Sequence, residues 1–132
     1  MKDKVIVDIR GWEEHIGKTS GYEDLVYKGR IPTSKWGKAG SNPGKLEYFR
    51  NNDGTMRDFQ QVLNGWMEGP WSIDIGKTLI FYCGTGWRAA EVWVYAKQFG
   101  LKDVHIYDFG FYEWSHLKNE VELGEVWKES NI

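Results

Sequence analysis

The sequence predicts a single α/β domain with a mainly parallel central sheet flanked by helices. Three apolar segments of strand length, at residues 5–7, 78–82 and 104–107, alternate with segments of helical pattern. Such alternation favours parallel pairing, because each helix carries the chain back to the edge from which the next strand starts. A length of 132 residues is enough for one domain with a hydrophobic core. We therefore expect one domain over residues 1–132.

The first half of the chain contains the first strand, a short helix and a long loop. Asp8 and Arg10 follow the apolar residues 5–7, so polar side chains stand at the carboxyl end of a buried strand, where open α/β sheets bind ligands. Residues 11–16 fit a short helix, and Pro32 keeps the residue before it extended. Residues 37–54 are rich in Gly, Asn, Ser and Lys, and they predict a long surface loop.

The second half of the chain predicts two longer helices around the middle strand. Residues 55–58 resemble a capping box at the start of the first helix, which Gly69 and Pro70 end. Its apolar face consists of Phe59, Val62, Leu63 and Trp66. The second helix covers residues 86–99 and closes at Gly100. Its expected inner face consists of Val92, Ala96 and Phe99.

The end of the chain predicts a last strand, a short helix and a charged tail. The strand at 104–107 is followed by a turn at 108–110 and a helix over 111–117. The tail contains four apolar residues that can dock on the body of the domain: Val121, Leu123, Val126 and Trp127.

Composition and charge exclude several classes of function. A net charge of −2 gives no reason to expect nucleic acid or an anionic membrane as a partner. One cysteine excludes an intrachain disulfide and a Cys-based zinc cluster, and the three histidines share no metal-ligand spacing, so we expect no metal and no cofactor. No apolar run approaches the roughly 20 residues of a membrane span. Because a strand starts almost at the first residue, the chain fits a domain cut from a longer protein, and its compartment stays open.

The only cysteine stands where the middle strand turns into a helix. The six residues of this turn are Cys83, Gly84, Thr85, Gly86, Trp87 and Arg88. Such a turn points consecutive backbone N–H groups toward one spot, and the helix that follows adds the positive end of its dipole. Both features favour the thiolate form of a thiol at the rim. The pattern predicts a nucleophilic Cys83 above an anion-binding loop.

In two interpretations of this turn, the cysteine has no catalytic role. Free Cys is often simply a buried structural residue, but a position between an apolar strand and Gly-x-Gly argues against that. Residues 84–89 also fit the dinucleotide pattern G-x-G-x-x-A, with Asp108 as the acid that binds the ribose. However, too few strand–helix units follow a motif in mid-chain, and Trp87 and Arg88 are bulky for a turn that approaches a pyrophosphate.

Two further interpretations use the thiolate. A cysteine phosphatase would resemble C-x5-R, whereas four residues separate Cys83 from Arg88, and no general acid for an alkoxide leaving group is evident. In sulfur transfer, the thiolate attacks the outer sulfur of a donor such as thiosulfate and expels sulfite, and the loop then holds a persulfide until a thiol or cyanide attacks it. Arg88 would attract the anionic donor. Because sulfite is a good leaving group, this chemistry needs no general acid.

The six-residue turn at 83–88 resembles the active loop of the rhodanese family, the thiosulfate-type sulfurtransferases. Asp8 and Arg10 resemble the early D-x-R strand end of this family. Residues 28–32 resemble its G-H-I-P segment, with Arg30 where His is commoner, and residues 108–114 resemble its G-G-x-x-x-W element, with Phe109 in place of the first Gly. The resemblance covers residues 4–117. It implies a three-layer rhodanese-like fold with Cys83 as the catalytic residue and residues 84–88 as the substrate-binding loop.

Residues 19–22, 35–37 and 52–57 make the chain most similar to one subgroup, the catalytic last domain of multi-domain bacterial thiosulfate sulfurtransferases. This resemblance implies companion rhodanese-like domains and, for some relatives, export. Mercaptopyruvate-using members carry a further arginine shortly after D-x-R, where this chain has Trp12, Glu13 and Glu14, so thiosulfate is the favoured donor. The acceptor is expected to be cyanide, a small thiol or a thioredoxin-like protein. The alternative is a carrier or protein-binding domain without turnover.

The residues around the loop leave several roles open. Asp8 is expected near the loop, where it pairs with Arg88 or accepts loop N–H bonds, and Arg10 binds the donor or pairs internally. A structural ion pair that braces the loop is an equal alternative for both. Trp87 either walls the pocket or contacts a partner, and Glu91 is expected on a solvated helix face.

Overall fold

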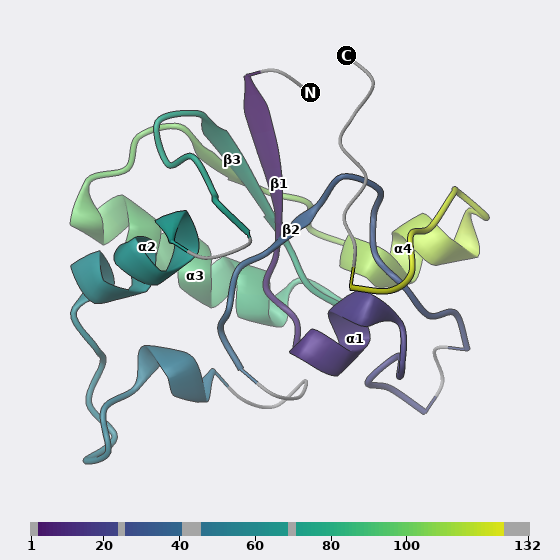
Figure 1. The fold of residues 1–132 in the computed structure, drawn as a ribbon, viewed down its shortest axis with the longest axis horizontal. Helices are drawn as coiled ribbons and strands as arrows, with labels where there is room; N and C mark the ends of the chain where they lie inside the picture. Colours follow the sequence, from purple (N-terminus) through teal and green to yellow (C-terminus); the bar gives the residue numbers. More distant parts are fainter. Residues whose placement is uncertain (1–2, 24–25, 41–45, 69–70, 126–132) are drawn as a thin grey trace.

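The computed structural model describes residues 3–23, 26–40, 46–68 and 71–125, and it is built around a parallel sheet (Figure 1). Its strands are β1 (Lys4–Asp8), β2 (Lys35–Trp36), β3 (Thr78–Tyr82) and β4 (Val104–Ile106). They lie in the order β2-β1-β3-β4, and every pair is parallel. The predicted α/β architecture is confirmed. The two-residue strand β2 was not expected, because two residues are too few for an alternating pattern.

Helices cover both faces of the sheet and form the outer layers of a three-layer domain. They are α1 (Trp12–Ile16), the 3-10 helix η1 (Glu47–Phe49), α2 (Phe59–Met67), α3 (Trp87–Phe99) and α4 (Gly110–His116). Figure 1 shows α2 and α3 together on one side of the strands, with α1 and α4 on the other. In the described part of the chain, no helix is long and apolar enough to span a membrane.

Alternation along the strands divides the core into two layers. Leu79 and Phe81 of β3 belong to the larger cluster, which also contains the buried face of α2 and residues of α3. Tyr82 points to the other face, where it packs with Ile31 and Phe111. Because side chains alternate between faces along a strand, one strand supplies both layers.

The first long helix begins later than its sequence signal suggests. Asp58, and not Thr55, is the N-cap of α2, and its carboxylate accepts a hydrogen bond from the N–H of Gln60 at 3.1 Å. Thr55 belongs to the preceding turn, where its hydroxyl donates to Asp53 at 2.6 Å. The expected capping box is therefore wrong, because a nearby aspartate offers Thr55 a local partner outside the helix.

The segment 37–54 is not wholly a surface loop. Ala39 and Phe49 are fully buried in the main core, and residues 47–49 form the helix η1. The ring of Phe49 lies 6.3 Å from those of Phe59 and Trp66. The expectation of a surface excursion fails here because isolated apolar residues anchor the segment without forming a periodic pattern.

Two further apolar predictions are confirmed in part at the edges of the domain. Val92 and Ala96 on α3 are buried as expected, whereas Phe99 is 41% exposed although its ring lies 5.7 Å from that of Phe59. In the tail, Val121 packs against the second core layer, and Leu123 is 60% exposed although its Cδ2 lies 2.3 Å from the position that a Cβ on Gly17 would take. The other two residues expected to dock, Val126 and Trp127, lie outside the described residues.

Candidate active site

Cys83 directly follows β3 and lies inside the turn that leads into α3. Its side chain is 1% exposed, and its Sγ accepts a hydrogen bond from the backbone N–H of Gly86 at 3.1 Å. Gly86 is the residue before the helix, so the sulfur lies at the amino end of α3. A backbone donor and a helix amino terminus both stabilise negative charge on this sulfur.

The turn is held in place by the amino end of α4. The backbone N–H of Phe111 donates to the carbonyl of Cys83 at 2.8 Å, and the N–H of Tyr112 donates to that of Gly84 at 3.0 Å. Gly110 has a φ of 60°, and a Cβ there would lie 2.3 Å from the carbonyl oxygen of Cys83. Glycine is required at position 110 by both its backbone conformation and this close approach. The sequence element at 108–114 thus fixes the loop.

Arg88 closes the turn in a buried ion pair with Glu14 of α1. Its Nη1 and Nη2 donate to the two carboxylate oxygens of Glu14 at 3.0 and 3.1 Å, and the two side chains are 4% and 1% exposed. Burial alone would lower the pKa of Arg88, but the Glu14 carboxylate more than offsets this and raises it. Arg88 therefore remains a cation whose two terminal nitrogens already have an anionic partner.

Tyr22 covers the loop from outside and was not predicted as a site residue. A Cβ on Gly84 would lie 2.3 Å from the Tyr22 ring and 2.6 Å from its hydroxyl, so the phenol occupies the space that glycine leaves open. The hydroxyl also accepts a hydrogen bond from Nη2 of Arg88 at 3.2 Å. Residue 22 belongs to the segment 19–22 that contributes to the subgroup resemblance, but that resemblance assigned it no role, and the three-dimensional contact places it at the site.

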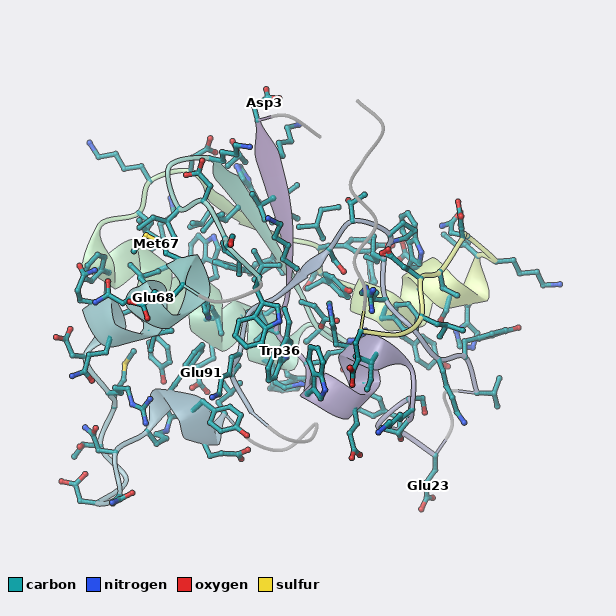
Figure 2. All side chains as sticks on the ribbon, viewed as in Figure 1. Asp3, Glu23, Trp36, Met67, Glu68 and Glu91 are labelled. Atoms are coloured by element: carbon teal, nitrogen blue, oxygen red, sulfur yellow. The ribbon has the colours of Figure 1, made fainter. Side chains whose placement is uncertain are left out.

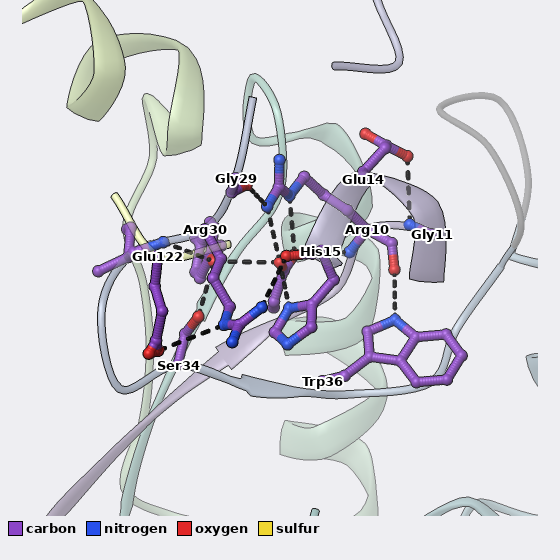
Figure 3. A network of polar contacts seen from close by, with 12 residues as sticks. Arg10, Gly11, Glu14, His15, Gly29, Arg30, Ser34, Trp36 and Glu122 are labelled. Atoms are coloured by element: carbon purple, nitrogen blue, oxygen red, sulfur yellow. Dashed lines mark hydrogen bonds and ion pairs between the residues drawn. The ribbon is translucent and has the colours of Figure 1, made fainter. Parts of the chain in front are cut away.

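Asp8 and Arg10, at the end of β1, belong to a buried polar network in which Figure 3 labels Arg10, His15 and Glu14. Arg10 donates from Nε and Nη2 to the Asp8 carboxylate at 2.9 and 2.8 Å, and Nη2 also reaches the carbonyl of Gly29 at 2.6 Å. Nδ1 of His15 lies 2.8 Å from the same carboxylate. Of the roles left open by the sequence, the structure places Asp8 with Arg10 and not with Arg88, and it places Arg10 in an internal pair that is fully buried.

The pKa values of this network follow from burial and pairing. Burial raises the pKa of Asp8, but Arg10, followed by His15, outweighs it and holds the pKa well below its ordinary value. Burial also lowers the pKa of His15, and the hydrogen bond with Asp8 only partly opposes this. The folded state therefore favours an ionised Asp8 beside a neutral His15.

Aromatic side chains occupy the positions next to Arg10 in this chain. Nε1 of Trp36 donates to the carbonyl of Arg10 at 2.7 Å. The rings of Trp12 and Trp36 lie 4.9 Å apart, and that of Trp71 lies 5.1 Å from Trp36. Three tryptophan rings thus lie together beside the backbone of Arg10.

The outer rim of the loop is exposed and largely apolar. Trp87 is 84% exposed and Phe109 is 64% exposed. Beside them lies a groove of about 350 Å³ lined by Thr85, Phe109, Tyr112, Glu113, His116 and Leu117. The exposure of Trp87 favours contact with a partner over a role as a pocket wall.

Glu91, labelled in Figure 2, lies one turn further along α3. It is half-buried and accepts hydrogen bonds from Arg50 at 2.7 Å and Tyr95 at 2.6 Å. The expectation of a purely solvated residue is corrected, because Arg50 from the segment before α2 reaches it. Among the described residues, no group of three or more His, Cys, Asp or Glu side chains could hold a metal ion.

Comparison with known proteins gives a consistent result. A family model described as the rhodanese-like domain matches residues 1–117. The chain is 45% identical over 131 residues to the thiosulfate sulfurtransferase YnjE of Escherichia coli (strain K12), covering 98% of this chain and 30% of YnjE. The crystal structure of YnjE superimposes with a TM-score of 0.88 at 46% identity, covering 96% of this chain and 30% of that chain.

A second group of solved relatives shares the fold. The complex of EanB with hercynine has a TM-score of 0.87 at 38% identity, and it covers 96% of this chain and 29% of that chain. The anaerobic ergothioneine biosynthesis enzyme from Chlorobium limicola, in complex with trimethyl histidine, has the same TM-score at 37% identity, with the same coverage. The chain thus spans about 30% of the length of the relatives that it matches.

Proposed function

This chain belongs to the rhodanese family of sulfurtransferases, and on that premise we propose that it transfers sulfane sulfur from thiosulfate through a persulfide on Cys83. The acceptor is a thiophilic group, either cyanide or a thiol. The substrate-binding residues are those of the loop, Gly84, Thr85, Gly86, Trp87 and Arg88, and Asp8 and Arg10 support its base.

One observation carries this proposal. The single cysteine of the chain lies in a six-residue turn, its Sγ accepts a backbone N–H from Gly86, and the turn closes on Arg88. A turn with four residues between Cys83 and Arg88 is smaller than a phosphate cradle with five, and it suits a single sulfur atom carried on the thiol.

The reaction proceeds in two half-reactions. The Cys83 thiolate attacks the outer sulfur of thiosulfate, a new S–S bond forms, and the old S–S bond breaks with its electron pair leaving on sulfite. The persulfide anion is stabilised at the amino end of α3, where Gly86 already donates to the sulfur. The acceptor then attacks the terminal sulfur, and the Cys83 thiolate leaves.

Mass spectrometry of the intact protein tests this proposal. After exposure to thiosulfate, the chain should gain the mass of one sulfur atom, and cyanide or dithiothreitol should remove it. The variant Cys83→Ala removes the only cysteine and should gain nothing. No gain at saturating thiosulfate would contradict the mechanism. Stoichiometric loading without steady formation of thiocyanate would instead indicate a carrier domain without turnover.

The full-length context is also a proposal. Because relatives such as YnjE are about three times as long as this chain, companion rhodanese-like domains are expected beside it. The exposed Trp87 and the groove beside Phe109 offer a surface next to the reactive sulfur for a thiol-bearing or thioredoxin-like acceptor.

A further inference from the structure

The positive charge expected at the reactive loop is balanced inside the domain. Glu14 binds both terminal nitrogens of Arg88, and its Oε1 also accepts the N–H of Gly11 at 3.1 Å. With three hydrogen bonds and 1% exposure, this carboxylate is fixed in place. Arg88 and Glu14 together present no net charge to an anion that approaches Cys83.

Two other buried arginines of the described residues also have anionic partners. Arg10 is paired with Asp8 at 2.8 Å, and Arg30 lies 3.5 Å from the carboxylate of Glu122. On the rim, Oδ1 of Asp108 lies 3.2 Å from the position that a Cβ on Gly86 would take. An anionic donor therefore depends on the backbone N–H groups and the helix dipole of the loop.

We propose that Glu14 is a specificity-determining residue: by neutralising Arg88, it reduces the advantage that a dianionic sulfur donor such as thiosulfate has over a donor of lower negative charge. This inference rests on the proposed function, since it concerns the donor of the same Cys83. Glu14 acts through Arg88 and does not itself touch the reacting sulfur atoms.

A simple relation makes the proposal quantitative. The Coulomb energy of a donor in the site is proportional to the charge of the donor. Removing the Glu14 charge should therefore change the logarithm of the binding constant twice as much for a dianion as for a monoanion. An improvement of about threefold for a monoanion therefore predicts an improvement of about tenfold for a dianion. The reaction of a neutral reagent with Cys83 should change little when the Glu14 charge is removed.

Thiosulfate and methanethiosulfonate are a suitable donor pair. Both carry one transferable sulfur, but thiosulfate is a dianion and methanethiosulfonate a monoanion. In both reactions the Cys83 thiolate bonds to the outer sulfur and one S–S bond breaks, with the electron pair leaving on sulfite or on methanesulfinate. The chemistry is therefore matched, and the donor charge is the main difference.

The first experiment measures charge at Cys83 without any sulfur transfer. Iodoacetate is an anion and iodoacetamide is its neutral counterpart, and Cys83 is the only thiol that either can alkylate. Glu14→Gln should raise the ratio of the iodoacetate rate to the iodoacetamide rate by about threefold. The control is Glu13→Gln, the same change at the neighbouring exposed residue of α1, which should leave the ratio unchanged.

The second experiment measures KM for the two donors. Glu14→Gln should lower the KM for thiosulfate by about tenfold and that for methanethiosulfonate by about threefold, so their ratio shifts in favour of the dianion. A purely structural Glu14 would instead impair both donors equally. An unchanged donor ratio together with an unchanged alkylation ratio would overturn the proposal.

A measurement on the unaltered protein covers the case in which Glu14→Gln does not fold. If the pair is neutral, the alkylation ratio should change by less than about twofold between low and high salt, because there is little charge to screen. A steep fall of the iodoacetate rate with salt would reveal an unbalanced Arg88 and overturn the inference. If neither donor loads sulfur while the alkylation ratio behaves as expected, the proposed function fails and the charge inference stands.

Discussion

Two of the buried arginine–carboxylate pairs among the described residues, Arg10–Asp8 and Arg88–Glu14, have the same chemistry but different surroundings. Arg10 and Asp8 are both fully buried, and the guanidinium of Arg10 also lies 4.4 Å from the centre of the Phe111 ring. Arg88 and Glu14 are nearly as buried, but Arg88 belongs to the turn that carries Cys83. In both pairs one guanidinium nitrogen lacks a hydrogen-bond partner, Nη1 of Arg10 and Nε of Arg88. The first pair lies at the end of β1, whereas the second lies in the turn that carries Cys83.

This difference shows that burial alone does not distinguish a structural ion pair from one that adjusts a site. Removing one partner of any buried pair leaves an uncompensated charge, at a cost of several kcal/mol. The position of the pair then decides whether stability or chemistry changes more. Three variants or conditions separate these effects.

The largest effect is expected from Asp8→Asn. Without the carboxylate, Arg10 stays buried without its anionic partner, and we expect a loss of about 3–5 kcal/mol in the free energy of unfolding. Urea denaturation followed by fluorescence measures this loss. As a control, Asp103→Asn changes an exposed carboxylate and should reduce stability far less. Equal losses of unfolding free energy in the two variants would show that the buried Asp8 pair contributes no more to stability than an exposed carboxylate.

A smaller effect, on the rate of sulfur transfer and not on stability, is expected from Arg88→Ala. This change leaves the Glu14 carboxylate without its cation near Cys83, so sulfur loading from thiosulfate should slow by roughly tenfold or more. Rapid quenching followed by intact mass measures the rate. The double variant Arg88→Ala with Glu14→Gln should recover part of the lost rate, because the negative charge is removed as well. If loading is unchanged in the single variant, Arg88 is only structural.

The smallest effect concerns pH and the histidine of the Asp8 network. Because the pKa of His15 in the folded protein lies below its ordinary value of 6.5, the unfolded state binds more protons near that pH. Its contribution to stability is therefore complete above about pH 6.5 and is lost as the pH falls further. Asp8, whose pKa is also lowered from 3.8, adds a loss in the same direction only under more acidic conditions.

Unfolding midpoints in urea between pH 7.5 and pH 5 check this prediction. The variant His15→Gln removes the titrating ring and should show a flatter profile over that range. A profile as steep as that of the unaltered protein would assign the pH dependence to other groups.

Much of the fold could be read from local sequence patterns. The strand at 78–82 and the helix that begins after Gly86 were predicted because their signals lie within a few residues of one another. The same holds for Cys83 in its glycine-rich turn. The signals that misled were also local: Thr55 resembles an N-cap, but Asp53 binds its hydroxyl.

The residues that the sequence did not identify are those whose partners are distant in the chain. Tyr22 contacts Arg88 across 66 positions, and the resemblance of residues 19–22 and 83–88 to one subgroup did not predict that contact. Phe49 is buried although no periodic apolar pattern surrounds it, because Phe59 and Trp66 cover it from α2. Packing between segments that are distant in the chain produces no periodic pattern in the sequence.

The sequence by itself determined the alternation of strands and helices and the glycine-rich turn with its single cysteine, because these follow from short-range sterics, hydrogen bonding and periodicity. It also placed Asp8 two positions from Arg10, close enough to pair locally. Only the tertiary structure decided that Arg88 pairs with Glu14, 74 positions away. Charges act through space, so the electrostatic character of the loop was fixed only when α1 packed against it.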